Sequence, residues 1–489
     1  MKRLIVIVFI IFGAFLTLCL YRTYAYDTSV VEEVPSTTDL EYTFKIGNSS
    51  IKQITVDSGE TRYYDIVLGN PNNAKISYGV YYEMVSPSTK PDGYSIEYTS
   101  KSTGNSTGKV DKNGNITLNL VVTNASSSTV TVKLGTVAGY VNGGELTLGS
   151  GQVIIPKALV NAVELITNLN DGTTGDSGSG VYKIIHSAIP AGSSATGSEI
   201  PAVTDYRYYG PSPNNYICLD MEGQSTCPDK HLYRIIGSIY DEKENTNRLK
   251  LIKATPLTDG TTSEFSWDYR VFNNGGVVYS NIWATITSGN YSNSLTSGSQ
   301  LMKLLNSGAW WNGTSGSYYN DSTTATTVNF TNYKLSDKAK SYITTSRYYL
   351  GGYNTSSGVM TNQFYVYERG TLRSLTAEPL YWEGMVGLMY PSDYGYAAGN
   401  SCVSGTKLYN YNGGCRIKDW LYISNDHQWL MSPHSDDSRF VFYVGKGGLF
   451  DTNLNDYTYA VRPVFYLNSS ASITNGDGSL NNPYLITLE

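Results

Sequence analysis

Between residues 42 and 134 the chain repeats one pattern, in which short runs of alternating apolar and polar residues are separated by clusters of turn-forming residues. The runs occupy residues 42–46, 51–56, 63–68, 76–84, 94–98, 116–122 and 130–134. Alternation of period two is typical of half-buried β-strands, and Gly, Asn, Pro and Ser clusters are typical of turns. Short strands at this spacing indicate two packed sheets. We therefore predict an all-β sandwich, forming a stalk, over residues 38–155.

The strand pattern stops after this region. Apolar residues between positions 156 and 169 fit one short helix, and residues 170–202 are rich in Gly, Ser and Thr. Such a composition is typical of flexible tethers. We therefore predict a short helix and a flexible linker over residues 156–204. His186 lies in a brief apolar stretch of this segment, where a short strand explains it better than a role as a ligand.

The remaining residues, 205–489, predict a separate α+β head domain, because a chain of 489 residues exceeds the usual size of one domain. Strand patterns open and close this region. Two helices are predicted between them, over residues 299–306 and 336–343, and Ser336 is a suitable N-cap for the second.

Six motifs of the head region resemble a family of uncharacterised surface proteins from gut Firmicutes. They lie at residues 205–218, 232–237, 249–253, 387–397, 429–432 and 461–467, the last reading Val-Arg-Pro-Val-Phe-Tyr-Leu. The order of the late elements is also similar to the C-type-lectin-like and formylglycine-generating-enzyme superfamily. The resemblance implies a small twisted sheet that displays long loops, with Arg462 as a structural arginine. The whole chain is then a multi-domain, β-rich protein with a C-type-lectin-like head.

The N-terminus has the pattern of an export signal. Lys2 and Arg3 precede an apolar run over residues 4–20, which as a helix spans about 26 Å. That length suits either a cleaved signal or a short membrane span, and Thr23-Tyr24-Ala25 is an acceptable cleavage site. We therefore predict that residues 1–25 are a signal peptide or a membrane anchor, with membrane contact through residues 4–20 if the segment is retained.

The cysteines agree with export. Outside the apolar run only four remain, and they fall into two local pairs, Cys218 with Cys227 and Cys402 with Cys415. Neither pair has the short spacing of a zinc or redox motif. We predict two local disulfides, with four free thiols as the alternative.

Composition restricts the kinds of partner. Charged residues make up only 16% of the chain and its net charge is −6, so no basic field is available to collect nucleic acid. The 43 tyrosines and 48 glycines, together with Ser, Thr and Asn, predict an uncharged, aromatic surface. Such residues are typical of adaptable binding surfaces and also of exported β-rich proteins that bind nothing.

Aromatic residues interleaved with short polar ones between positions 420 and 459 are the best candidates for ligand contact. Those expected to reach the surface are Tyr422, His427, His434, Tyr457 and Tyr459. The alternative is that these are ordinary exposed tyrosines of a Tyr-rich protein. His427 and His434, with three aspartates nearby, also suggest a transition-metal site, but their spacing matches no known motif. No metal, cofactor or catalytic residue is therefore predicted.

Together these features predict an extracellular display or adhesion protein, secreted or held at the cell surface, whose head binds a glycan or a protein. Two alternatives remain open, a structural subunit of an envelope or fibre and an extracellular hydrolase or modifying enzyme. The enzyme is disfavoured because no nucleophile elbow, phosphate loop or metalloprotease motif occurs in the chain.

Overall fold

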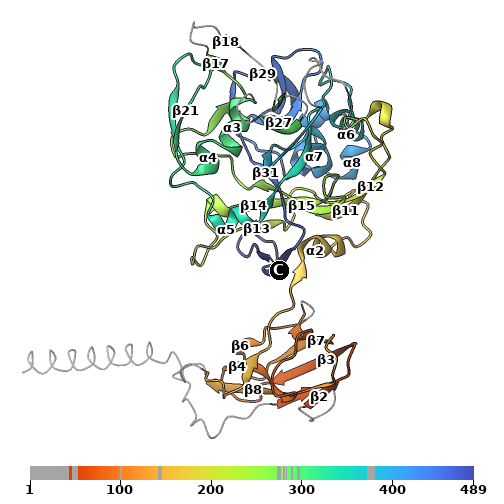
Figure 1. Cartoon of the computed structure of the whole chain (residues 1–489), viewed down its shortest axis with the longest axis vertical. Helices are drawn as coiled ribbons and strands as arrows, with labels where there is room; N and C mark the ends of the chain where they lie inside the picture. Colours follow the sequence, from red (N-terminus) through yellow and green to blue (C-terminus); the bar gives the residue numbers. More distant parts are fainter. Residues whose placement is uncertain are drawn as a thin grey trace, which may run out of the picture. The chain divides into compact units, whose positions relative to one another are not determined.

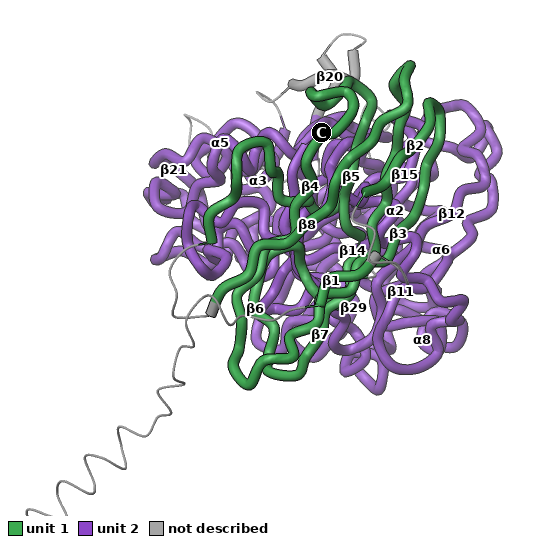
Figure 2. Tube along the Cα trace, turned by 90° about the horizontal axis from the view of Figure 1, so that it is seen from below, with its two compact units in different colours: residues 1–158 green, residues 159–489 purple. Residues whose placement is uncertain are grey.

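The computed structural model describes residues 43–46, 53–99, 102–140, 146–271, 277–278, 281, 283–287, 290–294, 298–371 and 380–488 (Figure 1). Strands make up most of the regular structure there, so the predicted β-rich fold is confirmed. The chain forms two compact units, unit 1 (residues 1–158) and unit 2 (residues 159–489), which Figure 2 shows in different colours.

The predicted signal or anchor segment, residues 1–25, lies outside the described residues. Within the described ranges, no helix combines the length and the apolar character that crossing a membrane requires.

Unit 1 contains two antiparallel sheets, with strand orders β1-β3-β7-β5 and β2-β8-β4-β6, and β9 pairs with β4. The strands are β1 (Thr43–Ile46), β2 (Gln53–Val56), β3 (Glu60–Gly69), β4 (Ile76–Ser86), β5 (Tyr94–Tyr98), β6 (Thr107–Val110), β7 (Asn115–Asn124), β8 (Val130–Tyr140) and β9 (Gln152–Ile154).

The two sheets of unit 1 share one apolar core. Leu118 and Leu120 of β7 are buried, whereas Asn119 between them is partly exposed, as the period of a strand requires. Val80 of β4 and Val132 of β8 belong to the same core from the other sheet. The predicted β-sandwich is therefore confirmed.

A mixed sheet of eleven strands is the largest element of unit 2. Its main path has the order β10-β32-β33-β13-β14-β15-β31-β23, while β12 joins β11 to β14 and β26 pairs with β31. The strands are β10 (Val160–Asn161), β11 (Gly180–His186), β12 (Val203–Tyr209), β13 (Tyr216–Cys218), β14 (Leu232–Asp241), β15 (Thr246–Lys253), β23 (Ile343–Thr344), β26 (Val386–Gly387), β31 (Val464–Leu467), β32 (Ala471–Asn475) and β33 (Tyr484–Leu488).

Smaller sheets complete unit 2, with orders β16-β30-β27-β28-β29, β19-β20-β25-β24, β17-β18 and β21-β22. Their strands are β16 (Glu264–Ser266), β17 (Arg270–Val271), β18 (Val277–Val278), β19 (Thr285–Thr287), β20 (Asn290–Ser294), β21 (Ser315–Tyr318), β22 (Thr326–Asn329), β24 (Ser346–Tyr349), β25 (Tyr381–Gly384), β27 (Gln428–Pro433), β28 (Phe440–Val444), β29 (Phe450–Leu454) and β30 (Thr458–Ala460).

The helices of unit 2 are short. They are α2 (Ala162–Asn168), α3 (Gln300–Asn306), α4 (Ala309–Asn312), α5 (Asp337–Ser341), α6 (Thr361–Glu368), α7 (Pro391–Ala397) and α8 (Asn400–Val403). The two helices predicted in the head are present as α3 and α5, and the Ser336 hydroxyl accepts the predicted capping bond from the Ala339 backbone N–H. A mixture of strands and helices is therefore present, while the C-type-lectin-like assignment of this unit stays a prediction.

The structure differs from the linker predicted over residues 156–204. The predicted helix is present as α2, but Ala162 and Ile166 of this helix are buried in the core of unit 2. β11 pairs with β12 along its whole length, from Gly180 to His186. Most of the predicted linker is thus part of unit 2, because its short apolar stretches supply a helix and an outer strand to the large sheet.

Candidate functional site

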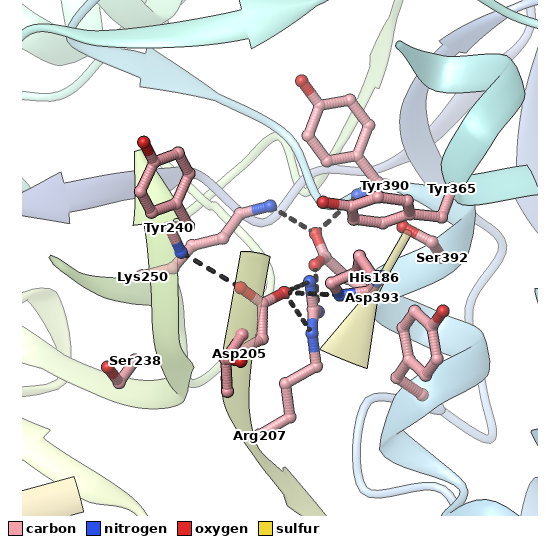
Figure 3. A network of polar contacts seen from close by, with 12 residues as sticks. His186, Asp205, Arg207, Ser238, Tyr240, Lys250, Tyr365, Tyr390, Ser392 and Asp393 are labelled. Atoms are coloured by element: carbon pink, nitrogen blue, oxygen red, sulfur yellow. Dashed lines mark hydrogen bonds and ion pairs between the residues drawn. The ribbon is translucent and has the colours of Figure 1, made fainter. Parts of the chain in front are cut away.

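A series of hydrogen-bonded, ionisable side chains lies in the interior of unit 2, and we call it the buried network (Figure 3). It comprises His186 of β11, Asp205 and Arg207 of β12, Lys250 of β15 and Asp393 of α7, whose side chains are at most 5% exposed. Charged groups removed from water are tolerated only when they are paired and hydrogen bonded. The stability of unit 2 therefore depends on how well these side chains are paired.

Strand periodicity places the first part of the buried network. Asp205 and Arg207 are two residues apart in β12, so their side chains lie on the same face of the sheet. Gly237 of β14 allows β12 to approach closely, because a Cβ atom at this position would lie 2.2 Å from the Tyr206 carbonyl oxygen. The glycine within the motif at residues 232–237 thus has a packing role.

Asp205 is the centre of the buried network. Its Oδ2 accepts hydrogen bonds from His186 Nε2 at 2.9 Å and from Arg207 Nε and Nη2 at 3.1 and 2.9 Å. Its Oδ1 accepts from the Tyr240 backbone N–H at 3.0 Å. Burial opposes ionisation of this carboxyl, but Arg207 and His186 outweigh it and hold the pKa of Asp205 far below its usual range.

Asp393 forms the other end. Its two carboxylate oxygens accept from Arg207 Nη1 at 2.7 Å and from Lys250 Nζ at 2.5 Å. The Tyr390 backbone N–H donates to the same carboxylate at 2.9 Å, which caps α7. Burial again opposes ionisation, but Lys250 and Arg207 lower the pKa of Asp393. The two carboxylates and two cations balance in charge, so a neutral His186 leaves the buried network neutral.

A second buried group lies where α6 ends. Glu368 accepts from the backbone N–H and hydroxyl of Ser392 at 2.8 and 2.7 Å and from Arg369 Nη1 at 3.1 Å. Burial raises the pKa of Glu368 to about 7, although these bonds oppose the shift. α6 and α7 can lie this close because Gly395 faces Thr361, where a Cβ atom would be 2.2 Å from the Thr361 hydroxyl oxygen.

A pocket of about 350 Å³ adjoins the buried network at His186. It lies between the segment that follows β11 and the helices α6 and α7, and we call it the His186 pocket. The His186 ring stacks on Tyr365, with ring centres 3.7 Å apart and planes at 6°, and the Tyr396 ring meets it edge-on at 5.6 Å. The imidazole is therefore held firmly in one orientation.

The surroundings of His186 also fix its protonation. The Asp205 carboxylate can only accept, so His186 Nε2 must carry a hydrogen. Burial lowers the pKa of His186, with Asp205 opposing, so the ring is neutral at about pH 7. Nδ1 is then a lone-pair acceptor, and it has no hydrogen-bond partner among the residues that the structure describes. The His186 pocket thus offers an acceptor, but no described hydroxyl or thiol is hydrogen bonded to it as a nucleophile.

The five residues predicted to contact a ligand do not form one site. The rings of His427 and Tyr459 stack at 4.9 Å, and Tyr457 lies 6.4 Å from Tyr459. Tyr457 is 47% exposed, but Tyr459 is only 6% exposed. The expectation that Tyr459 reaches the surface is therefore wrong, because its ring packs 4.4 Å from Trp429, which is fully buried.

Tyr422 and His434 lie elsewhere. The Tyr422 hydroxyl donates to the carbonyl oxygen of Lys446, in the loop between β28 and β29. His434 Nδ1 accepts from the backbone N–H groups of Asp436 and Asp437 at 3.2 and 3.1 Å, so it stabilises the turn after β27. His427 and His434 flank opposite ends of β27, and their rings contact different aromatic neighbours, Tyr459 and Phe442. The geometry gives no support to a shared metal site.

Another cluster has a possible ligand set for a metal. One side-chain ligand atom from each of Asp220, Glu222 and His231 lies within 4.8 Å of the others. However, the Lys230 ammonium is 2.9 Å from Glu222, and the Lys338 ammonium is 3.8 Å from Asp220. These cations already balance the charge of the two carboxylates, so we interpret the arrangement as a cluster of ion pairs.

Both predicted disulfides are present, Cys218–Cys227 and Cys402–Cys415. The first closes the loop that carries Asp220 and Glu222, and the second joins α8 to the segment before Trp420. The prediction from local spacing is confirmed.

Sequence reasoning missed the buried network. The available signal was charge inside apolar strands, since Asp205 and Arg207 alternate with tyrosines and Lys250 lies between two leucines. That alternation predicts one exposed face, whereas the structure covers both. Lys250 and Asp393 are separated by 143 residues, so local periodicity cannot pair them.

Comparison of the chain with protein-family models, with curated proteins and with solved structures gives no match.

Proposed function

We propose that the protein acts outside the cytoplasm as a surface display or adhesion protein and that unit 2 binds a glycan or a protein partner. Two disulfides support an oxidising compartment, because such bonds rarely persist in the reducing cytosol. The export signal or membrane anchor predicted over residues 1–25 and the low charge of the chain agree with this compartment. In this proposal the sandwich of unit 1 is the stalk.

The observation that carries the binding part of the proposal is the surface around Tyr457, which we call the aromatic surface. Tyr457 is 47% exposed and adjoins the partly exposed His427 through the buried Tyr459. The Tyr459 ring packs 4.4 Å from the buried Trp429, so the exposed Tyr457 lies beside a packed aromatic cluster. A rigid, half-exposed tyrosine supplies contact area with little loss of side-chain entropy, as in many protein interfaces.

The resemblance of unit 2 to a surface-protein family and to the C-type-lectin-like fold is also part of this proposal. The six motifs at residues 205–218, 232–237, 249–253, 387–397, 429–432 and 461–467 all lie in unit 2, and their resemblance supports a surface protein with a C-type-lectin-like head.

Glycan and protein arrays probed with the full chain test the proposal. We expect binding to a defined set of partners that Tyr457→Ala weakens at least tenfold, as for a central interface tyrosine. Tyr63→Ala is the matched control, because Tyr63 is 77% exposed but lies in unit 1. Equal losses with both variants, or ordered self-association without any partner, would contradict the proposal, and self-association would favour a structural subunit.

A further inference from the structure

The His186 pocket is separate from the aromatic surface and has its own chemistry. Four hydroxyl-bearing residues line it together with His186, namely Ser187, Ser193, Tyr365 and Tyr396. None of these four hydroxyl groups has a hydrogen-bond partner in the part of the chain that the structure describes. Several polar groups that converge on one concave site, with free hydrogen-bonding capacity, are typical of small-molecule sites.

All of the polar groups that line the His186 pocket are uncharged. The other lining side chains include the Asn362 amide and the apolar side chains of Ile185, Ile189 and Val366. The two arginines that lie over the lining tyrosines, Arg207 and Arg369, are each already paired with a carboxylate. Arg207 is bonded to Asp205 and Asp393, and the Arg369 guanidinium lies 3.6 Å from the centre of the Tyr365 ring. An anionic ligand would therefore lose its water without gaining a counter-charge.

The aromatic faces are occupied too. The Tyr365 ring stacks on His186 and also has the Arg369 guanidinium against it. Arg207 lies 5.1 Å from the Tyr396 ring centre. A flat aromatic ligand would thus find little free ring surface to stack on. Recognition must come from hydrogen bonds, with aliphatic contact at the rim, where Ile185 is 70% and Val366 is 42% exposed.

We propose that the His186 pocket binds one uncharged sugar residue, either free or at the end of a glycan, through hydroxyl groups that donate to His186 Nδ1 and exchange hydrogen bonds with the lining hydroxyls. A pyranose carries several hydroxyl groups and a patch of aliphatic C–H groups, which matches this lining. The volume, about 350 Å³, is near the lower end for ligand pockets and suits a single ring. This inference rests on the proposed role of unit 2 in glycan binding but assigns it a second, distinct site.

Ligand-observed NMR titrations of the full chain test this inference. The probes are glucose, galactose, mannose and N-acetylglucosamine as neutral sugars, with glucuronic acid and phenol as the charged and the aromatic comparisons. We expect at least one neutral sugar to bind, and glucuronic acid to bind at least tenfold more weakly than that sugar. Binding of phenol alone, or tighter binding of glucuronic acid, would overturn the inference.

Three variants locate the binding site. Val366→Trp places an indole at the rim and should abolish sugar binding, whereas Ile417→Trp, at a position that is 69% exposed and does not line the pocket, should leave it unchanged. His186→Gln keeps a donor for Asp205 but removes the Nδ1 acceptor, and should weaken binding by about tenfold. Sugar binding that survives Val366→Trp would overturn the inference, provided that circular dichroism shows a folded protein.

The outcomes also separate this site from the aromatic surface. If Tyr457→Ala abolishes array binding while Val366→Trp does not alter any sugar titration, the proposed function holds and the pocket inference fails. If sugar titrations respond only to the pocket variants and no partner responds to Tyr457→Ala, the reverse is true.

Discussion

Unit 1 and unit 2 handle charge in opposite ways. The ion pairs described in unit 1, such as Lys75 with Asp111, have side chains that are 42–78% exposed. Among the residues of unit 1 that the structure describes, the buried polar ones are uncharged, and the amides of Asn70 and Asn124 bond to backbone carbonyl oxygens. Unit 2 instead buries two aspartates, an arginine and a lysine in the buried network. The apolar core of unit 1 requires only that apolar residues alternate along each strand. The interior of unit 2 also requires specific charged pairs between residues far apart in the sequence.

Removing one carboxylate from the buried network should have the largest effect. Asp393→Ala leaves Lys250 buried without a counter-charge and leaves Arg207 with Asp205 alone, so we expect the free energy of unfolding of unit 2 to fall by about 3–5 kcal/mol. Hydrogen exchange of amides in β12 and α7, compared with those in β7, reports each unit separately.

Asp111→Ala is the control in unit 1. Its side chain is 78% exposed, so the loss of its ion pair with Lys75 should lower the stability of unit 1 by less than about 1 kcal/mol. The comparison between the units fails if Asp393→Ala affects unit 2 no more than Asp111→Ala affects unit 1.

Truncation of a buried apolar side chain in unit 1 should destabilise unit 1 and leave unit 2 unchanged. Leu118→Ala in β7 removes a fully buried side chain from the sandwich and should lower the stability of unit 1 by about 2–5 kcal/mol, without changing exchange in unit 2. Val121→Ala alters the partly exposed face of the same strand, and its effect should be clearly smaller. Similar losses for the two variants would argue against a well-packed sandwich core.

The disulfides belong only to unit 2 among the described residues. Cys402 and Cys415 are separated by 13 positions, so replacing both with Ser should destabilise unit 2 by ~3 kcal/mol on the chain-entropy estimate. Exchange in unit 1 should stay unchanged. Parallel destabilisation of both units would show that they do not unfold separately.

The stability of unit 2 should depend on pH through the raised pKa of Glu368. Its folded pKa of about 7 lies above the value of an unfolded glutamate, so folding favours the protonated form. The stabilisation is complete below about pH 4.3 and is lost as the pH rises through about 7. The lowered pKa of His186 acts in the opposite direction, because acidification charges a ring that the fold keeps neutral.

Glu368→Gln isolates the contribution of this carboxyl, which lies among Arg369, Ser392 and Asp393. The stability difference between wild type and variant, measured by urea unfolding at a series of pH values, should shift in favour of the variant as the pH rises from about 4.5 to about 7. A constant difference across that range would show that Glu368 has an ordinary pKa.

Sequence patterns predicted unit 1 far better than unit 2. Strands such as β5 and β7 follow from local alternation, although β6 and β9 were not predicted because they are only four and three residues long, too short to show a pattern. The two disulfides and the capped helices α3 and α5 were also local features. The buried network was not, since Arg207 meets Asp393 only through the packing of β12 against α7. Tyr459 was misplaced for the same reason, because its burial depends on Trp429 of another strand.

The tautomer of His186 tests most directly the claim that the buried network prepares a binding pocket. NMR of nitrogen-labelled histidine rings can resolve all four histidines, and His186→Gln assigns the relevant signals. At about pH 7 we predict a neutral ring with the hydrogen on Nε2 and a bare Nδ1, whose resonance shifts when a neutral sugar binds. A charged ring, or a hydrogen on Nδ1, would contradict this account.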